Sequence, residues 1–93
     1  MVVAVITWEL SIPGCSSLKE KRGVVRSLKD RLSNRFNVSV AETGRHDAHA
    51  RAELTAALVA TDRRFAESVL DRMDRFVASH GRAVLAGTQR TFY

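Results

Sequence analysis

The sequence is poor in cysteine, in aromatic residues and in acidic side chains. Its single cysteine, Cys15, excludes an intramolecular disulfide and the zinc sites that several cysteines build, and a reducing compartment fits it best. Long apolar runs are also missing, because the apolar start at residues 1–8 is too short to span a bilayer and lacks the basic segment of a signal peptide. We therefore expect a cytoplasmic protein with no membrane partner.

Acidic residues are outnumbered by basic ones, 10 against 15, which gives a formal net charge of +5. The surplus lies between residues 17 and 35, where Glu20 and Asp30 oppose seven basic residues: Lys19, Lys21, Arg22, Arg26, Lys29, Arg31 and Arg35. The remaining chain carries eight residues of each sign. Such a local excess of positive charge is typical of a protein with an anionic partner.

Apolar residues make up 45% of the 93-residue chain, which is enough for one continuous core. We therefore expect a single domain over residues 1–93, with no linker. A core of this size is two layers thick, and a shared subunit interface is compatible with its modest stability.

The first third of the sequence predicts a strand followed by a helix. Residues 2–10 are rich in β-branched and aromatic residues, and Pro13-Gly14 marks a turn after them. The run Ser17-Leu18-Lys19-Glu20 matches a capping box, so a helix is expected from there to Asn34. Its buried stripe consists of apolar residues at helical spacing: Leu18, Val24, Val25, Leu28 and Leu32.

Two strands with alternating apolar residues follow the helix. The first has Phe36, Val38 and Val40 on its inner face, and residues 43–50 then lack apolar periodicity and form a loop. The second covers residues 51–60 and is antiparallel to the first, with alternate residues inside: Ala52, Leu54, Ala56 and Leu58.

A second helix and a last strand complete the chain. Thr61-Asp62 offers the N-cap of an amphipathic helix, and Gly81, after His80, is expected to stop it in a left-handed conformation. Residues 82–92 form the last strand. The order βαββαβ predicts an α+β, ferredoxin-like fold, a four-stranded antiparallel sheet with both helices on one face.

Five basic side chains of the first helix are the candidate RNA-binding residues: Lys19, Lys21, Arg22, Arg26 and Lys29. Four of them are spaced three, four and three residues apart and line one exposed ridge, consisting of Lys19, Arg22, Arg26 and Lys29. The ridge suits a row of phosphates. A solvated helix face that keeps a small protein soluble explains the same pattern, so both readings stay open.

Lys21 differs from the other four, because helical projection places it near the apolar stripe, with its stem along the sheet edge. Its ammonium then needs water or a carboxylate, and Glu9, late in the first strand, is the candidate partner. An ordinary stabilising ion pair explains such a contact more simply than a functional one.

Catalytic and metal-binding patterns are weak in this sequence. His46, Asp47 and His49 form a polar loop with no identifiable further ligand, and Cys15 has no histidine near it in sequence. The chain has no Gly-rich phosphate loop, no G-x-S-x-G elbow and no paired-carboxylate signature. We therefore predict no enzyme activity, no cofactor and no metal.

The expected open face of the sheet carries small and polar residues: Asn37, Ser39, Ala41, Glu53, Thr55 and Ala57. A platform on which bases stack needs aromatic side chains there, so any RNA contact would run through the RNA backbone and the basic helix. The same open face is suited to a dimer interface.

Three features together resemble the YlxP-like family of small bacterial proteins: the run S-L-K-E-K-R at 17–22, the run R-F-N-V-S-V-A-E at 35–42, and Asp47 with Arg51. The resemblance implies a ferredoxin-like fold with no established enzymatic activity, encoded near genes for translation initiation and ribosome maturation. The chain departs from the family pattern at His49 and Ala50, where a large aromatic residue and a glutamine are common. Gly23 likewise replaces a usual basic residue.

The sequence thus favours a non-enzymatic binding protein that contacts structured or ribosomal RNA, or the small ribosomal subunit, through its basic first helix. The alternative is a module that forms a homodimer, recruits a protein partner and has no nucleic-acid role.

Overall fold

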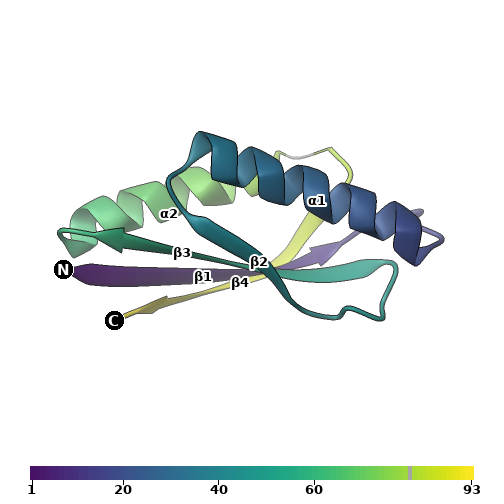
Figure 1. Cartoon of the computed structure of the whole chain (residues 1–93), viewed down its shortest axis with the longest axis horizontal. Coiled ribbons are helices and arrows are strands. Elements are labelled where there is room, and N and C mark those ends of the chain that lie inside the picture. The colour runs from purple at the N-terminus through teal and green to yellow at the C-terminus, as the bar shows by residue number, and fades with distance from the viewer. Residues whose placement is uncertain (80) are drawn as a thin grey trace.

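The computed structural model describes residues 1–79 and 81–93 and contains a four-stranded sheet covered by two helices (Figure 1). The elements follow the order β1 (Val2–Ser11), α1 (Leu18–Arg35), β2 (Ser39–Gly44), β3 (Arg51–Ala60), α2 (Arg63–Ala78) and β4 (Val84–Phe92). The strands are antiparallel and lie in the order β2-β3-β1-β4. The predicted ferredoxin-like α+β fold is confirmed.

The two helices lie on one side of the sheet and leave its other face open (Figure 1). Strand β1 is central and pairs with β3 along its whole length, from Val2 opposite Ala60 to Ser11 opposite Arg51. Alternate β1 residues are buried beneath the helices: Ala4, Ile6, Trp8 and Leu10. Because successive strand residues point to opposite faces, the residues between them, Glu9 among them, belong to the open face.

The N-terminus of α1 confirms half of the predicted capping box. The Ser17 hydroxyl accepts a hydrogen bond from the backbone N–H of Glu20 at 3.1 Å, as an N-cap serine does. The Glu20 carboxylate does not reach back to Ser17 and accepts instead from Arg82 Nη2 at 2.9 Å. The first turn of α1 is therefore tied to the segment before β4.

Strand β2 begins later than predicted, because Phe36 caps the C-terminus of α1. The Phe36 N–H donates to the Leu32 carbonyl at 2.9 Å, and its ring is buried at the end of the core. The strand continues to Gly44, so the predicted loop from residue 43 starts two residues later. Arg45 follows in the left-handed region, with φ of 57°.

Helix α2 begins as predicted and ends differently. The Asp62 carboxylate accepts from the Phe65 N–H at 2.8 Å, which confirms the N-cap. Ser79 caps the C-terminus in a right-handed conformation. The prediction of a left-handed Gly81 is wrong, because the positive φ among the described glycines belongs to Gly14, at 77°. His80, also named in that prediction, lies outside the described residues.

Candidate nucleic-acid interface

The predicted ridge lies along α1 on the outer side of the helical layer. Lys19, Arg22 and Arg26 are exposed, and Lys29 is half-buried. None of the four forms an ion pair with any carboxylate of the described chain. The ridge is therefore a row of positive charges that no carboxylate of the described chain contacts.

Five other basic side chains have carboxylate partners: Lys21, Arg45, Arg63, Arg82 and Arg90. Within the described residues, most of the unpaired basic side chains belong to the two helices: Lys19, Arg22, Arg26, Lys29, Arg31 and Arg35 on α1, and Arg64, Arg72 and Arg75 on α2. The sequence indicated a surplus on the first helix alone. When the paired side chains are set aside, the surplus of positive charge is found on both helices.

Two basic residues of α2 keep their positive charge because two acidic residues of the helix form ion pairs with an arginine of β4. Arg90 of β4 binds Asp71 at 2.8 Å and Asp74 at 2.6 Å. Burial alone lowers the pKa of Arg90, but these two carboxylates outweigh it and raise the pKa above its ordinary value. By helical projection the two acids lie on the flank opposite Arg72, so Arg72 keeps its charge for the side that faces α1, whereas Arg75 lies on the outer side of α2.

The structure corrects the assignment of Lys21. The residue is 1% exposed, and its ammonium donates to the Arg45 carbonyl at 2.6 Å. The Nζ atom also lies 3.0 Å from Glu42 Oε2, as an ion pair outside hydrogen-bond geometry. Lys21 is therefore inaccessible to RNA, because its apolar stem enters the core and its charge is used between α1 and β2.

Glu9, the candidate partner of Lys21, pairs with a different residue. Glu9 points to the open face of the sheet, where its Oε2 accepts from Arg45 Nε at 2.7 Å. This hydrogen bond is the main reason why the pKa of Glu9 lies below its ordinary value, while desolvation opposes the shift. Lys21 lies on the other side of the sheet, and Arg45 connects the two groups through its carbonyl and its guanidinium.

The open face carries hydroxyl and small side chains, as predicted. Thr55 shares hydrogen bonds with Thr7 at 3.0 Å and with Thr43 at 2.8 Å. At the other end, Val3 exchanges backbone hydrogen bonds with Tyr93 and lies opposite Val59. Tyr93 is thus one exposed aromatic side chain at the edge of this face, which is insufficient for a stacking platform.

The polar loop lies at the surface, whereas the cysteine is buried. His46, Asp47 and His49 are exposed. Across residues 1–79 and 81–93, no group of three or more His, Cys, Asp and Glu side chains is placed to hold a metal ion. Cys15 is buried, with its Sγ 3.5 Å from the Ser17 carbonyl oxygen.

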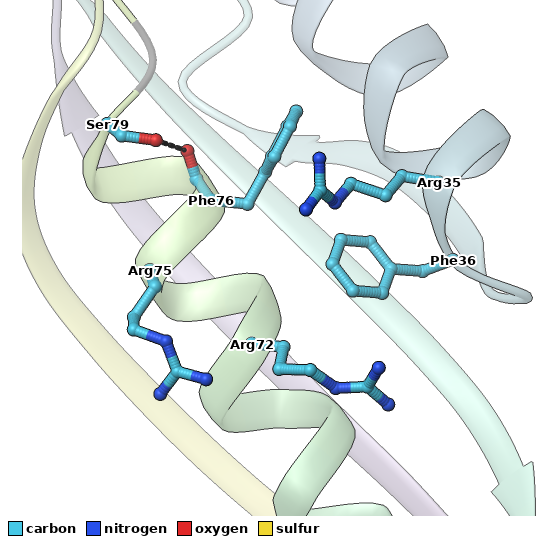
Figure 2. A pocket seen from close by; sticks show the side chains of 6 residues that line it. All are labelled: Arg35, Phe36, Arg72, Arg75, Phe76 and Ser79. Atoms are coloured by element: carbon cyan, nitrogen blue, oxygen red, sulfur yellow. Dashed lines mark hydrogen bonds between the residues drawn. The ribbon is translucent and has the colours of Figure 1, made fainter.

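Sequence reasoning missed a cavity of about 490 Å³ between the end of α1 and the end of α2. It is lined by arginines, phenylalanines and one serine: Arg35, Phe36, Arg72, Arg75, Phe76 and Ser79 (Figure 2). The available signal was the Arg-Phe pair that occurs at both 35–36 and 75–76. Pairing those two segments requires the packing of α1 beside α2, which periodicity does not give.

No helix in the described parts of the chain is long and apolar enough to cross a membrane.

A family model described as "Protein of unknown function (DUF503)" matches residues 3–90. The chain belongs to this family. Among curated members, the uncharacterized protein YlxP of Bacillus subtilis (strain 168) is 38% identical over 71 residues, which are 76% of this chain and 77% of YlxP. The family resemblance seen in the sequence motifs is thus confirmed.

Two solved structures resemble this chain at low sequence identity. The cofactor-independent oxygenase SnoaB from Streptomyces nogalater superposes with a TM-score of 0.50 at 10% identity, over 99% of this chain and 90% of SnoaB. The periplasmic domain P4 of SecDF has a TM-score of 0.47 at 14% identity, over 98% and 88% of the two chains. At such identities, the likeness to SnoaB concerns the fold alone.

Proposed function

We propose that this DUF503 protein is a non-enzymatic, cytoplasmic binder of structured RNA, with ribosomal RNA of the small subunit as the first target to test. The ridge of α1 carries the contact. One observation supports this most: Lys19, Arg22, Arg26 and Lys29 have no carboxylate partner among the described residues, whereas five basic side chains elsewhere do. Unpaired surface cations release counterions when they meet phosphates, which is the main source of sequence-independent affinity.

The ridge suits an RNA backbone in length and rigidity. From Lys19 to Lys29 it extends about 15 Å along the helix axis, enough for several successive phosphates. The helix is fixed at its N-terminus by Ser17, by the Glu20–Arg82 pair and by Lys21. Lys21 thus contributes by positioning α1 rather than by touching RNA. Recognition through the backbone depends on the shape of the RNA and not on its base sequence.

The experiment is a salt titration of binding to ribosomal RNA and to small ribosomal subunits. Replacing Arg22 and Arg26 by Ala should weaken binding and reduce the slope of log K against log salt by about 1 to 2. The matched control replaces Arg51 and Arg64 by Ala, which removes the same charge from unpaired arginines off the ridge. If the ridge variant binds like the wild type, or if both variants lose the same slope, the ridge is not the RNA site.

A second candidate is a homodimer that uses the open face of the sheet. The row Val59, Val3 and Tyr93 supports it, because Val59 is 68% exposed and Tyr93 is 78% exposed beside a face that no helix covers. In this case light scattering at micromolar concentration should give twice the chain mass, and Val59→Asp should give the monomer. A wild-type monomer in that experiment would eliminate the dimer.

A further inference from the structure

Three arginines line the cavity between the two helices, and none of the described carboxylates pairs with them. Arg35 comes from the last turn of α1, and Arg72 and Arg75 come from α2 (Figure 2). In the described chain none of the three is in an ion pair, and the acids of α2 are held by Arg90 and Arg63. Arginine binds phosphate through a planar fork of donors, so this site is suited to an anion with several oxygen acceptors.

Aromatic rings form the inner wall of the same cavity. The rings of Phe36 and Phe76 meet edge to face, with centroids 6.1 Å apart and an interplanar angle of 80°. The Arg35 guanidinium lies 5.5 Å from the Phe76 centroid and 6.0 Å from the Phe36 centroid. Figure 2 shows it extending from α1 towards the two rings. Aromatic rings and guanidinium planes are the surfaces on which unstacked bases lie in RNA-binding proteins.

The size of the cavity favours a ligand larger than a bare phosphate. A volume of about 490 Å³ is in the range of small-molecule sites and leaves most of the space empty around a bare phosphate. A neighbouring hollow of about 380 Å³, lined by Arg31, Asn34, Arg35 and Phe76, shares two residues with it and extends the groove along α1. The site therefore has room for a planar ring in addition to a phosphate.

We propose that this cavity binds one nucleotide unit, with the base against Phe76 and Arg35 and the phosphate held by Arg72, with the charge of Arg75 nearby. The unit is either a free nucleotide or an unpaired nucleotide of an RNA strand, because both present the same ring and phosphate. The site goes beyond the proposed RNA contact. By helical projection Arg35 lies on the flank of the α1 stripe opposite Arg22 and Arg26, so the two sites are separable by mutation.

The test is a titration of the isotope-labelled full-length protein with adenosine 5′-monophosphate, followed by NMR chemical shifts, with ribose 5-phosphate and adenosine as partial probes. We expect saturable shifts at the cavity residues in the millimolar range or below. Each partial probe should bind about tenfold more weakly, since it lacks either the ring or the phosphate. Absence of saturable shifts with the nucleotide, or equal binding of ribose 5-phosphate, would overturn the proposal.

Variants locate the site and separate it from the ridge. Arg72→Gln/Arg75→Gln should weaken nucleotide binding about tenfold or more, whereas the control Arg51→Gln/Arg64→Gln should leave it unchanged. All four side chains are exposed, so these changes preserve the core. Equal effects of the two double variants would overturn the assignment. The ridge variant Arg22→Ala/Arg26→Ala should retain nucleotide binding even if the RNA proposal fails.

A competition experiment distinguishes the two sources of the nucleotide. If a single-stranded RNA oligomer displaces the mononucleotide and its own binding also requires Arg72 and Arg75, the site holds an unpaired nucleotide of RNA. If the oligomer binds independently of these arginines and leaves the mononucleotide in place, the site holds a free nucleotide. Both results support the cavity as a nucleotide site. If ribose 5-phosphate or adenosine competes as well as the mononucleotide in either experiment, the proposal is contradicted.

Discussion

Lys21 and Glu42 form an ion pair, with Nζ 3.0 Å from Oε2, that joins the two family-like sequence runs. Lys21 belongs to the run at 17–22 and Glu42 ends the run at 35–42. The same ammonium donates to the carbonyl of Arg45, whose φ of 57° turns the chain after β2. The pair therefore fixes the first turn of α1 against the β2–β3 connection.

Replacing Lys21 by Met should destabilise the protein by about 3 kcal/mol, because Glu42 Oε2 and the Arg45 carbonyl then lose their buried partner. Urea unfolding followed by the fluorescence of Trp8, the single tryptophan, measures the change. The control Lys19→Met, at an exposed position two residues away, should shift stability by less than about 0.5 kcal/mol. Equal stability of both variants would show that the pair contributes nothing.

Replacing Asp74 by Ala should cost about 2 kcal/mol, because the Trp8 indole N–H, buried in the core, donates to Asp74 Oδ1 at 2.8 Å. Asp74→Asn keeps a carbonyl acceptor and should cost less. Asp71→Ala is the matched control, since it removes a contact with the same Arg90 but none with Trp8. A cost for Asp71→Ala as large as that for Asp74→Ala would assign the effect to Arg90 instead.

Stability should fall in acid partly through Glu9. Its pKa in the folded protein lies below the ordinary 4.5, chiefly because of the hydrogen bond from Arg45. The unfolded chain thus takes up the proton first, so the contribution of Glu9 is complete above pH 4.5 and is lost as the pH falls through its folded pKa. Glu9→Gln should flatten this acid limb of the unfolding free energy.

Arg45→Met should flatten the acid limb in the same way as Glu9→Gln, and the double variant should add little. Unfolding free energies measured from neutral pH downward give the comparison. An acid limb in Glu9→Gln as steep as in the wild type would contradict the role of this pair.

Replacing Gly23 by Ala should stabilise the protein by up to about 1 kcal/mol. Gly23 lies within α1, and an added Cβ would meet no atom within 4 Å. Gly14→Ala provides the contrast, because its φ of 77° favours glycine and the substitution should cost about 1 kcal/mol. Thermal unfolding measures both, and a destabilised Gly23→Ala would show a constraint on α1 that its packing does not reveal.

The basic ridge could be predicted because it depends on local geometry alone. A spacing of three or four residues places side chains on one helix face whatever the rest of the fold does. The capping serine Ser17 and the N-cap Asp62 were found for the same reason, since each contacts a backbone N–H three residues on. Lys21 was correctly placed near the apolar stripe by the same projection, although its burial and its partner were not foreseen.

By itself the sequence determined the succession of strands and helices along the chain and which face of each is buried, because hydrophobic periods of two and about 3.6 residues are carried by neighbouring residues. Only the tertiary structure decided which charges are neutralised. Glu42 rather than Glu9 meets Lys21, and Arg90 binds the acids of α2 and leaves Arg72 and Arg75 unpaired. These contacts join residues distant in the chain, and Coulomb attraction depends on their separation in space, which strand order and helix packing set.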